Sequence, residues 1–464
     1  MIELRGADVL VAGAGISGLA AAEALVAAGA LVTVTDARPA ALADLPAGAV
    51  AGGDPDVVPP GTAVIVTSPG RRPDHPLVAA AAAAGVPIVG EPELAWWLGQ
   101  AQPQPPTWLV VTGTNGKTTT VGMLAEILTA AGLDAVACGN IGLPVVTAVA
   151  AGRRVLAVEL SSFQLHWSPS IVPAAGCVLN VADDHLDWHG SMAAYAAAKA
   201  MALVGPIAVA GVDDPAAAAL LTASPAARHV GVTIGEPGPD QLGIVDGQLV
   251  DRAFGGGELI AVDAVEPGGT PGLTDALAAA ALARAHGVDT AAIRAGIATF
   301  RPGPHRGAVV AEADGVAFVD DSKATNPHAA QAAIDRQGAR PIVWIVGGLF
   351  KGADVDGLVG AVADRLRGVV VIGTDRRPVV DALARHAPEV PVVEVTAGDH
   401  GAMPGPRTPL MTAAVEAAAT LAVPGDVVLL APAAASMDQF RDYAERGAVF
   451  AAAATELSRA GSRA

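Results

Sequence analysis

Short runs of β-branched residues alternate with alanine-rich stretches along the chain, and most of these runs end in glycine, serine or an acidic residue. This alternation is typical of parallel β-sheets whose strands are joined by crossover helices. It predicts an α/β chain. The runs that we expect to form strands are 8–13, 31–36, 63–68, 86–90, 108–113, 154–160, 175–181, 206–211, 315–322, 341–348, 368–373, 390–395 and 426–432.

Two proline-rich segments divide these runs into three sets. The segment "GQAQPQPPT" (99–107) follows the first set, and "RPGPHRG" (301–307) precedes the last set. Such segments are typical of linkers. Because 464 residues suffice for about three domains, we expect domains at 1–104, 105–302 and 303–464.

Composition and charge exclude several classes of function. No stretch of roughly 18 residues combines large apolar side chains with freedom from charge, glycine and proline, so we expect no membrane insertion. The net charge of −18 disfavours binding to nucleic acid. Cys138 and Cys177, the two cysteines, form neither a disulfide framework nor a metal-binding spacing. No signal peptide is recognisable at the N-terminus, and we expect a cytoplasmic enzyme.

A first nucleotide fingerprint lies near the N-terminus. "GAGISG" (Gly13–Gly18) joins an expected strand to an expected helix, and the next strand ends at Asp36. Glycines let the backbone approach a phosphate, while the helix N-terminus supplies free N–H groups. The pattern predicts a ligand with a nucleoside diphosphate. It does not distinguish NAD from other nucleotides.

A second fingerprint, "GTNGKTTT" (113–120), resembles a P-loop shortened at its start. Gly113 and Gly116 allow a compact loop whose N–H groups face phosphate oxygens. Lys117 supplies a positive charge, and the Thr118 hydroxyl is a ligand for Mg²⁺. Phosphoryl transfer also requires a carboxylate for the metal, and Glu159 ends an apolar run where parallel-sheet active sites lie. ATP and Mg²⁺ are the expected ligands of this site.

Eight motifs, the first of them the shortened P-loop itself, share their order and detail with one family. They are "GTNGKTT", "GNIGLP", "ELSSFQL", "NVADDHLDWHG", "YAAAK", "PHR", "DDSKATN" and "APAAASMDQF". Together they resemble the Mur ligase family over all three expected domains. The resemblance implies a Rossmann-like N-terminal domain that holds a UDP-linked substrate, a central P-loop ATPase-like domain, and a Rossmann-like C-terminal domain for the amino acid. It explains two nucleotide sites, since substrate and energy source are both nucleotides.

The resemblance also implies a reaction and its partners. ATP would convert the carboxylate of UDP-N-acetylmuramoyl-L-alanine to an acyl phosphate, which the amine of D-glutamate would attack, in the synthesis of a peptidoglycan precursor. Only small-molecule substrates are implied, and we expect a monomer. The base that deprotonates the amine stays open. His185 is one candidate, but metal ligation would preclude that role.

The site residues follow from the same resemblance, position by position. Those expected on ATP are Gly113, Thr114, Asn115, Gly116, Lys117, Thr118, Thr119, Arg306 and Asp321. Those expected on the UDP-linked substrate or on glutamate are Ile16, Ser17, Asp36, Arg38, Ser68, Pro69, Gly70, Asn140, Ser161, Lys323, Thr325, Lys351, Ser436, Met437 and Tyr443. The expected metal ligands are Thr118, Glu159, His185 and Lys199, the last as a carbamate. The residues expected in catalysis are Lys117, Glu159, His185, Lys199 and Arg306.

One stretch departs from the family pattern. Thr274 and Asp275 stand where amide side chains that contact adenine are expected, and an ionised aspartate accepts hydrogen bonds without donating any. Residues 252–272 also match poorly.

Three alternatives remain open. A sibling ligase would add a different amino acid. An NAD-dependent oxidoreductase would leave the P-loop unexplained, and a non-catalytic scaffold would bind ATP without turnover.

Overall fold

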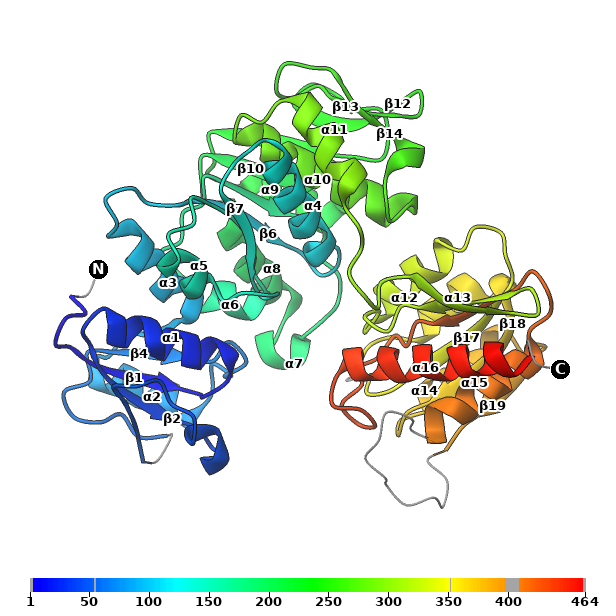
Figure 1. The fold of residues 1–464 in the computed structure, drawn as a ribbon, viewed down its shortest axis with the longest axis horizontal. Coiled ribbons are helices and arrows are strands. Elements are labelled where there is room, and N and C mark those ends of the chain that lie inside the picture. Colours follow the sequence, from blue (N-terminus) through cyan, green and yellow to red (C-terminus); the bar gives the residue numbers. More distant parts are fainter. Residues whose placement is uncertain (1–2, 54–55, 351, 397–408, 462–464) are drawn as a thin grey trace. The chain divides into compact units, whose positions relative to one another are not determined.

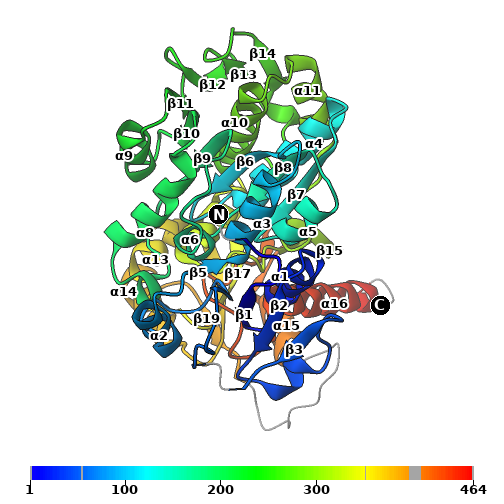
Figure 2. The same cartoon turned by 90° about the vertical axis from the view of Figure 1, so that its left-hand side faces the viewer.

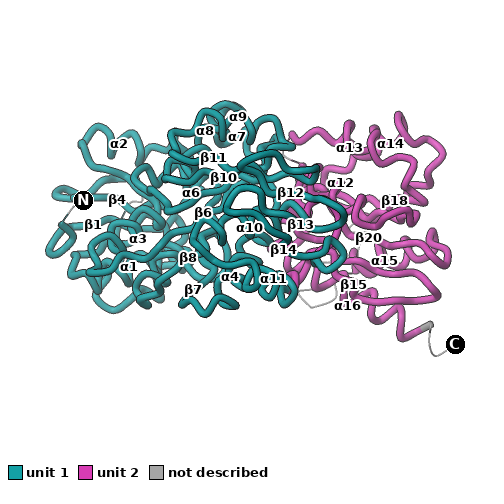
Figure 3. Tube along the Cα trace, turned by 90° about the horizontal axis from the view of Figure 1, so that it is seen from above, with its two compact units in different colours: residues 1–266, 272–300 teal, residues 267–271, 301–464 magenta. Residues whose placement is uncertain are grey.

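The computed structural model describes residues 3–53, 56–350, 352–396 and 409–461 (Figure 1). Lys351, expected in the glutamate pocket, therefore lies outside the described residues. The chain divides into two compact units (Figure 3). Unit 1 comprises residues 1–266 and 272–300, and unit 2 comprises residues 267–271 and 301–464.

Unit 1 begins with a five-stranded, fully parallel sheet of order β3-β2-β1-β4-β5. The strand order reverses between β1 and β4, the point where ligands of such sheets bind. The strands are β1 (Asp8–Ala12), β2 (Leu31–Thr35), β3 (Ala49–Ala51), β4 (Val64–Thr67) and β5 (Ile88–Gly90). The helices are α1 (Ile16–Ala27), the short 3₁₀ helix η1 (Pro39–Leu42), α2 (Pro76–Ala84) and α3 (Glu91–Gln100).

The second sheet of unit 1 has nine strands in the order β14-β13-β12-β11-β10-β9-β6-β8-β7. Pairing is parallel from β7 to β12 and antiparallel from β12 to β14. The strands are β6 (Thr107–Thr112), β7 (Ala135–Gly139), β8 (Val155–Glu159), β9 (Ala175–Val178), β10 (Ile207–Gly211), β11 (Arg228–Val232), β12 (Gln241–Val245), β13 (Gln248–Asp251) and β14 (Glu258–Ala261).

Helices cover this sheet, and two of them meet at unusually close range. A Cβ atom at Gly296 of α11 would lie 2.4 Å from the Ile127 Cα of α4, and Figure 2 shows the two helices side by side. The helices are α4 (Lys117–Ala130), α5 (Val145–Ala150), α6 (Ser162–His166), α7 (Leu186–His189), α8 (Met192–Ala200), η2 (Met201–Leu203), α9 (Pro215–Ala223), η3 (Val262–Ala264), α10 (Gly269–Ala285) and α11 (Thr290–Thr299).

Unit 2 contains a six-stranded sheet of order β15-β16-β20-β17-β18-β19, in which β15 alone pairs antiparallel among the described strands. Its strands are β15 (Ala308–Ala313), β16 (Val316–Asp320), β17 (Ile342–Gly347), β18 (Leu366–Ile372), β19 (Val392–Glu394) and β20 (Val427–Leu430). Its helices are α12 (Pro327–Asp335), α13 (Asp356–Val362), η4 (Ala363–Arg365), α14 (Arg377–His386), α15 (Pro409–Leu421) and α16 (Tyr443–Gly461).

The predicted fold class is confirmed: the chain is α/β, with three sheets that are mainly parallel. One buried apolar cluster runs from Val9 and Leu25 beside the N-terminal sheet to Val146 and Leu160 beside the central sheet. The two sheets of unit 1 therefore share part of one core. Among the described residues, no helix has the length and apolar character needed to cross a membrane. Boundaries near 104 and 302 stay predictions.

Candidate active site

The glycine-rich turn between β1 and α1 depends on its glycines for close packing. A Cβ at Gly13, whose φ is +124°, would lie 1.9 Å from Ser68 Oγ, and one at Gly18 would lie 1.8 Å from the Gly13 carbonyl oxygen. At Gly15 no atom lies within 4 Å of such a Cβ, and Gly15 caps α1 without a side-chain hydrogen bond. Two glycines thus fix the turn, while the third leaves the helix N-terminus accessible to an anionic group.

Asp36 lies beside this turn, as its place after β2 predicts. Its carboxylate accepts from the N–H groups of Ala14 and Arg38, both at 2.9 Å, and from Arg38 Nε at 3.2 Å. Partial burial raises the pKa of Asp36, but the backbone hydrogen bonds from Arg38 and Ala14 outweigh it and lower the pKa to about 2. Asp36 is therefore ionised at neutral pH. The Ile16 side chain, also expected on the substrate, is 79% exposed at the start of α1.

The shortened P-loop joins β6 to α4, and Gly116 has a left-handed φ of +87°. Lys117 Nζ donates to the carbonyl oxygens of Gly113 at 2.8 Å and Thr114 at 3.0 Å. Asn180, which follows β9, braces the loop, because its Oδ1 accepts from the Asn115 N–H at 2.9 Å. These bonds hold the loop against the carboxyl ends of two neighbouring strands.

Tyr195 provides a second brace for the loop. Its hydroxyl lies 3.0 Å from Thr114 Oγ1, and the same Oγ1 accepts from the Ala182 N–H at 2.9 Å. Tyr195 is 1% exposed and belongs to α8. The sequence motif "YAAAK" contained this residue, yet the motif did not indicate that it contacts the P-loop.

Glu159 lies where a metal-binding carboxylate is expected. It ends β8, and the strand register places it opposite Val111, just before the P-loop. Its Oε1 accepts from Asn140 Nδ2 at 2.8 Å, which brings two predicted site residues together. Its buried Oε2 has no hydrogen-bond partner among the described residues. A buried carboxylate oxygen left in this way fits a cation ligand.

Lys199 is 1% exposed, although an ammonium group is costly to bury. Its Nζ lies 4.4 Å from the centroid of the Tyr195 ring. Burial lowers the pKa of Lys199 well below that of a free lysine, and the charge of Lys117 lowers it further, while Asp184 acts in the opposite direction. The side chain is thus biased toward the neutral amine.

His185, the remaining expected ligand, has a left-handed φ of +55° directly before α7. Its Nδ1 lies 3.5 Å from Asp184 Oδ1, and its ring centroid lies 4.7 Å from that of Phe163. Within the described part of the chain, no three His, Cys, Asp or Glu side chains form a group that could hold a metal ion. The expected metal site is not a group of these four residue types alone, because its expected ligands include Lys199.

In unit 2, the "PHR" motif meets the end of β16. His305 Nδ1 and Asp320 Oδ2 are 2.6 Å apart, and a Cβ at Gly447 would lie 2.1 Å from the same His305 nitrogen. Asp321, expected on ATP, is 5% exposed and bonded to Arg336. Burial raises the pKa of Asp321 to about 6, against the lowering effect of the Arg336 and Arg306 charges.

A buried arginine that sequence reasoning missed, Arg446, contacts Ser322, the residue before Lys323. Arg446 is 1% exposed and donates to Ser322 Oγ at 3.0 Å and to the Ser322 carbonyl at 2.9 Å. Ser322 Oγ in turn donates to the Tyr443 carbonyl at 2.8 Å, and Lys323 Nζ lies 4.9 Å from the Tyr443 ring centroid. Ser436 is buried, whereas Met437 is 62% exposed.

Asp275, where the sequence departs from the family pattern, is buried against the P-loop in the structure. This residue is 5% exposed, and its Oδ1 accepts from Thr120 Oγ1 at 3.0 Å. A Cβ at Gly116 would lie 2.3 Å from the same oxygen. Asp275 therefore contacts the P-loop and the first turn of α4.

A P-loop at the carboxyl end of a parallel sheet, with a buried carboxylate on the adjacent strand, places the chain in the class of P-loop α/β nucleotide-binding proteins. Three family models narrow this class. They are the Mur ligase MurD-like N-terminal domain over 7–90, the Mur ligase middle domain over 111–250, and the Mur ligase glutamate ligase domain over 305–434. The chain belongs to the Mur ligase family, and the resemblance inferred from its motifs is confirmed.

Two similar relatives are each named UDP-N-acetylmuramoylalanine–D-glutamate ligase. The one from Mycolicibacterium vanbaalenii is 54% identical over 97% of this chain and 98% of its own length. The one from Nocardia farcinica is 53% identical over 98% of this chain and 97% of its own length.

Solved structures share the fold at lower identity. UDP-N-acetylmuramate-alanine ligase MurC from Thermotoga maritima has a TM-score of 0.58 at 17% identity and covers 99% of this chain and 100% of its own. MurF ligase from the same organism, in complex with ADP, has a TM-score of 0.55 at 19% identity and covers 100% of this chain and 97% of its own.

Proposed function

We propose that this chain joins D-glutamate to UDP-N-acetylmuramoyl-L-alanine with conversion of ATP to ADP and phosphate, in the synthesis of a peptidoglycan precursor. The observation that carries the proposal is the 54% identity, over 97% of the chain, to a relative with that name. The Glu159 carboxylate beside the P-loop gives the proposal a chemical basis.

The reaction requires two steps. In the first, the substrate carboxylate attacks the γ-phosphorus of ATP, and ADP leaves as the acyl phosphate forms. In the second, the neutral amine of glutamate attacks the acyl carbon, an amide bond forms, and phosphate leaves. Lys117, Thr118, Arg306 and the P-loop N–H groups would hold the phosphates, and Asp321 would contact ATP. Charge stabilisation of this kind is usually the largest contribution to the rate.

Asp36, Arg38 and the turn Ser68–Gly70 would bind the UDP portion, with Asn140 near the reacting carboxylate. The hydrogen bonds from Ala14 and Arg38 support the assignment of Asp36, because they keep this carboxylate ionised and oriented beside the turn. Lys323 would pair with a carboxylate of glutamate, and Thr325, Ser436, Met437 and Tyr443 would line that pocket. Lys351 stays a sequence-based proposal.

Glu159, His185, Thr118 and a carbamate on Lys199 would hold Mg²⁺, which neutralises charge on the phosphoryl oxygens when it is bound. The free Oε2 of Glu159 supports this assignment. A neutral Lys199 amine can attack CO₂, forming an N–C bond and losing one proton, and the carbamate then offers oxygen ligands to a hard cation. The burial that lowers the pKa of Lys199 favours this step.

Phosphate release tests the proposal. The chain is incubated with ATP, Mg²⁺, UDP-N-acetylmuramoyl-L-alanine and, in separate reactions, D-glutamate, L-glutamate, L-alanine or L-lysine. We expect release that depends on both the acceptor and D-glutamate. Release with a different amino acid would indicate a sibling ligase, and ATP binding without release would indicate a scaffold. We also propose a monomer in the cytoplasm, and sedimentation of the purified chain tests the oligomeric state.

A further inference from the structure

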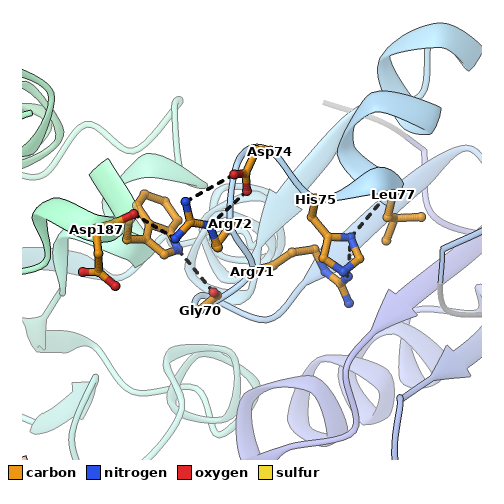
Figure 4. A network of polar contacts seen from close by, with 8 residues as sticks. Gly70, Arg71, Arg72, Asp74, His75, Leu77 and Asp187 are labelled. Atoms are coloured by element: carbon orange, nitrogen blue, oxygen red, sulfur yellow. Dashed lines mark hydrogen bonds and ion pairs between the residues drawn. The ribbon is translucent and has the colours of Figure 1, made fainter. Parts of the chain in front are cut away.

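The segment between β4 and α2 carries two adjacent arginines whose side chains point to opposite sides (Figure 4). It includes the turn Ser68–Gly70, which is expected to bind the substrate. Arg71 points toward the N-terminal sheet, and Arg72 points toward the loop of α7. Each arginine anchors one side of the segment.

Arg71 anchors the segment to its own sheet. Its Nε donates to Thr67 Oγ1 at 2.9 Å, and its Nη2 donates to the Ala12 carbonyl at 3.4 Å. Its Nη1 lies 2.9 Å from a ring nitrogen of His75. The turn is therefore held at the carboxyl ends of β1 and β4, beside the glycine-rich turn.

Arg72 anchors the other side of the segment to Asp187 of α7, 115 positions away in sequence. Its Nη1 donates to the Asp187 carbonyl at 2.8 Å. Asp74 holds the guanidinium in this orientation by accepting from Nε at 3.0 Å and from Nη2 at 3.2 Å. A second bond runs the opposite way, from Trp188 Nε1 to the Gly70 carbonyl at 3.2 Å. The segment between β4 and α2 and the helix α7 are thus joined by two hydrogen bonds that use backbone carbonyls as acceptors.

The contact continues from Trp188 to His185. Trp188 is 8% exposed, and its ring centroid lies 4.7 Å from that of Phe163. The ring centroid of His185 also lies 4.7 Å from that of Phe163. A continuous chain of contacts therefore leads from the substrate turn to a proposed metal ligand.

We propose that Arg72 and Trp188 are positioning residues that couple the substrate turn to the metal-binding loop, so that the UDP-linked substrate strengthens metal binding. This inference rests on the proposed function, because it takes the turn as a substrate site and His185 as a metal ligand. Neither residue touches the reacting atoms. Their effect is to fix the loop of His185 relative to Gly70.

The size of the expected effect follows from this arrangement. The Arg72 and Asp74 side chains are 49% and 69% exposed, and exposed ion pairs contribute little to global stability. Outer-shell residues that orient metal ligands, in contrast, change metal affinity roughly 10- to 100-fold when they are lost. Loss of Arg72 should thus weaken the metal binding that the substrate promotes, while leaving thermal stability nearly unchanged.

The test measures Mn²⁺ binding, with Mn²⁺ as the probe for Mg²⁺, from the electron paramagnetic resonance signal of the free ion. Binding is measured with and without UDP-N-acetylmuramoyl-L-alanine in the wild-type chain, Arg72→Ala and Trp188→Phe. Trp188→Phe removes the Nε1 donor and keeps an aromatic ring against Phe163. Arg153→Ala is the matched control, because Arg153 makes an exposed ion pair with Asp134 at 2.8 Å.

We expect the substrate to tighten Mn²⁺ binding in the wild-type and control chains. In Arg72→Ala this gain should fall roughly tenfold, and in Trp188→Phe it should fall by a smaller factor. The kcat should decrease in both variants without a change in the KM for glutamate. Arg72→Ala and Trp188→Phe chains that keep the wild-type gain would overturn the inference. A wild-type chain that releases no phosphate in the ligation assay would instead reject the proposed function.

Discussion

Replacement of Glu91 by glutamine should change the stability of the protein in a pH-dependent way. The free energy of unfolding of the variant, compared with that of the wild-type chain at the same pH, should be higher at pH 8 than at pH 5. Glu91 begins α3, is 2% exposed, and accepts from the Val146 N–H of α5 through Oε1 at 2.6 Å. Its Oε2 has no hydrogen-bond partner among the described residues. The ionised form of Glu91 is therefore unfavourable, because its charge is buried and only one of its oxygens accepts a hydrogen bond from the described residues. Glutamine keeps an acceptor oxygen for Val146 and carries no charge.

The magnitude follows from the pKa. Burial raises the pKa of Glu91 from 4.5 to about 7, although the hydrogen bond from the Val146 N–H lowers it in part. The folded chain thus binds more protons than the unfolded chain between these two pH values, so the free energy of unfolding falls as the pH rises through this window. A pKa shift of this size contributes about 3 kcal/mol to the free energy of unfolding at low pH. Most of this contribution is lost between pH 5 and pH 7.

Urea unfolding of both chains at pH 5, 6, 7 and 8 measures the effect. Tryptophan fluorescence suits this assay, because Trp96 and Trp97 belong to the same helix as Glu91. The difference in the free energy of unfolding, Glu91→Gln minus wild type, should increase by about 2 to 3 kcal/mol from pH 5 to pH 8. Glu126→Gln removes the same charge from an exposed position of α4 and should retain the wild-type pH dependence. A difference that stays constant across the four pH values would refute this reasoning.

Three lysines provide further predictions. Lys117→Ala should abolish phosphate release and leave the calorimetric affinity for UDP-N-acetylmuramoyl-L-alanine within a few-fold of wild type; equal loss of both would show that the two nucleotide sites are not separate. Lys323→Ala should raise the KM for glutamate roughly ten- to a hundredfold and that for ATP far less, because a charged hydrogen bond contributes about 1.5–3 kcal/mol; an unchanged KM for glutamate contradicts the assignment. Lys199→Ala should lose most activity and regain part of it with added acetate, whereas Lys199→Arg should stay inactive; near-wild-type turnover of the arginine variant would exclude the carbamate.

The sequence predicts the parallel core well, because its signals are local. The P-loop and the carboxylate of Glu159 each follow an apolar run, and the register of β6 with β8 brings them together. Short or irregular edge strands are harder to predict. The strands β12 to β14 pair antiparallel, and the register of β13 with β14 shifts between Leu249 and Val250. A period-two pattern is weak in such segments.

The braces of the site could not be predicted, because their partners are distant in sequence. Tyr195 and Thr114 are 81 positions apart, and Arg446 and Ser322 are 124 positions apart. Nothing in the composition around Arg446 distinguishes it from a surface arginine at the start of a helix. The departure at Asp275 was visible, but its contact with Thr120 depends on how α10 meets α4.

The strand order of unit 2 has a consequence for how the chain is made. Strands β16 and β17 both pair with β20, which lies between them although it is the last strand of that sheet in sequence. Neither β16 nor β17 therefore has both of its neighbouring strands until residues 427–430 have emerged from the ribosome. Domains generally fold as units during synthesis, with N-terminal ones first. We thus expect unit 1 to fold on the nascent chain before β20 completes the sheet of unit 2.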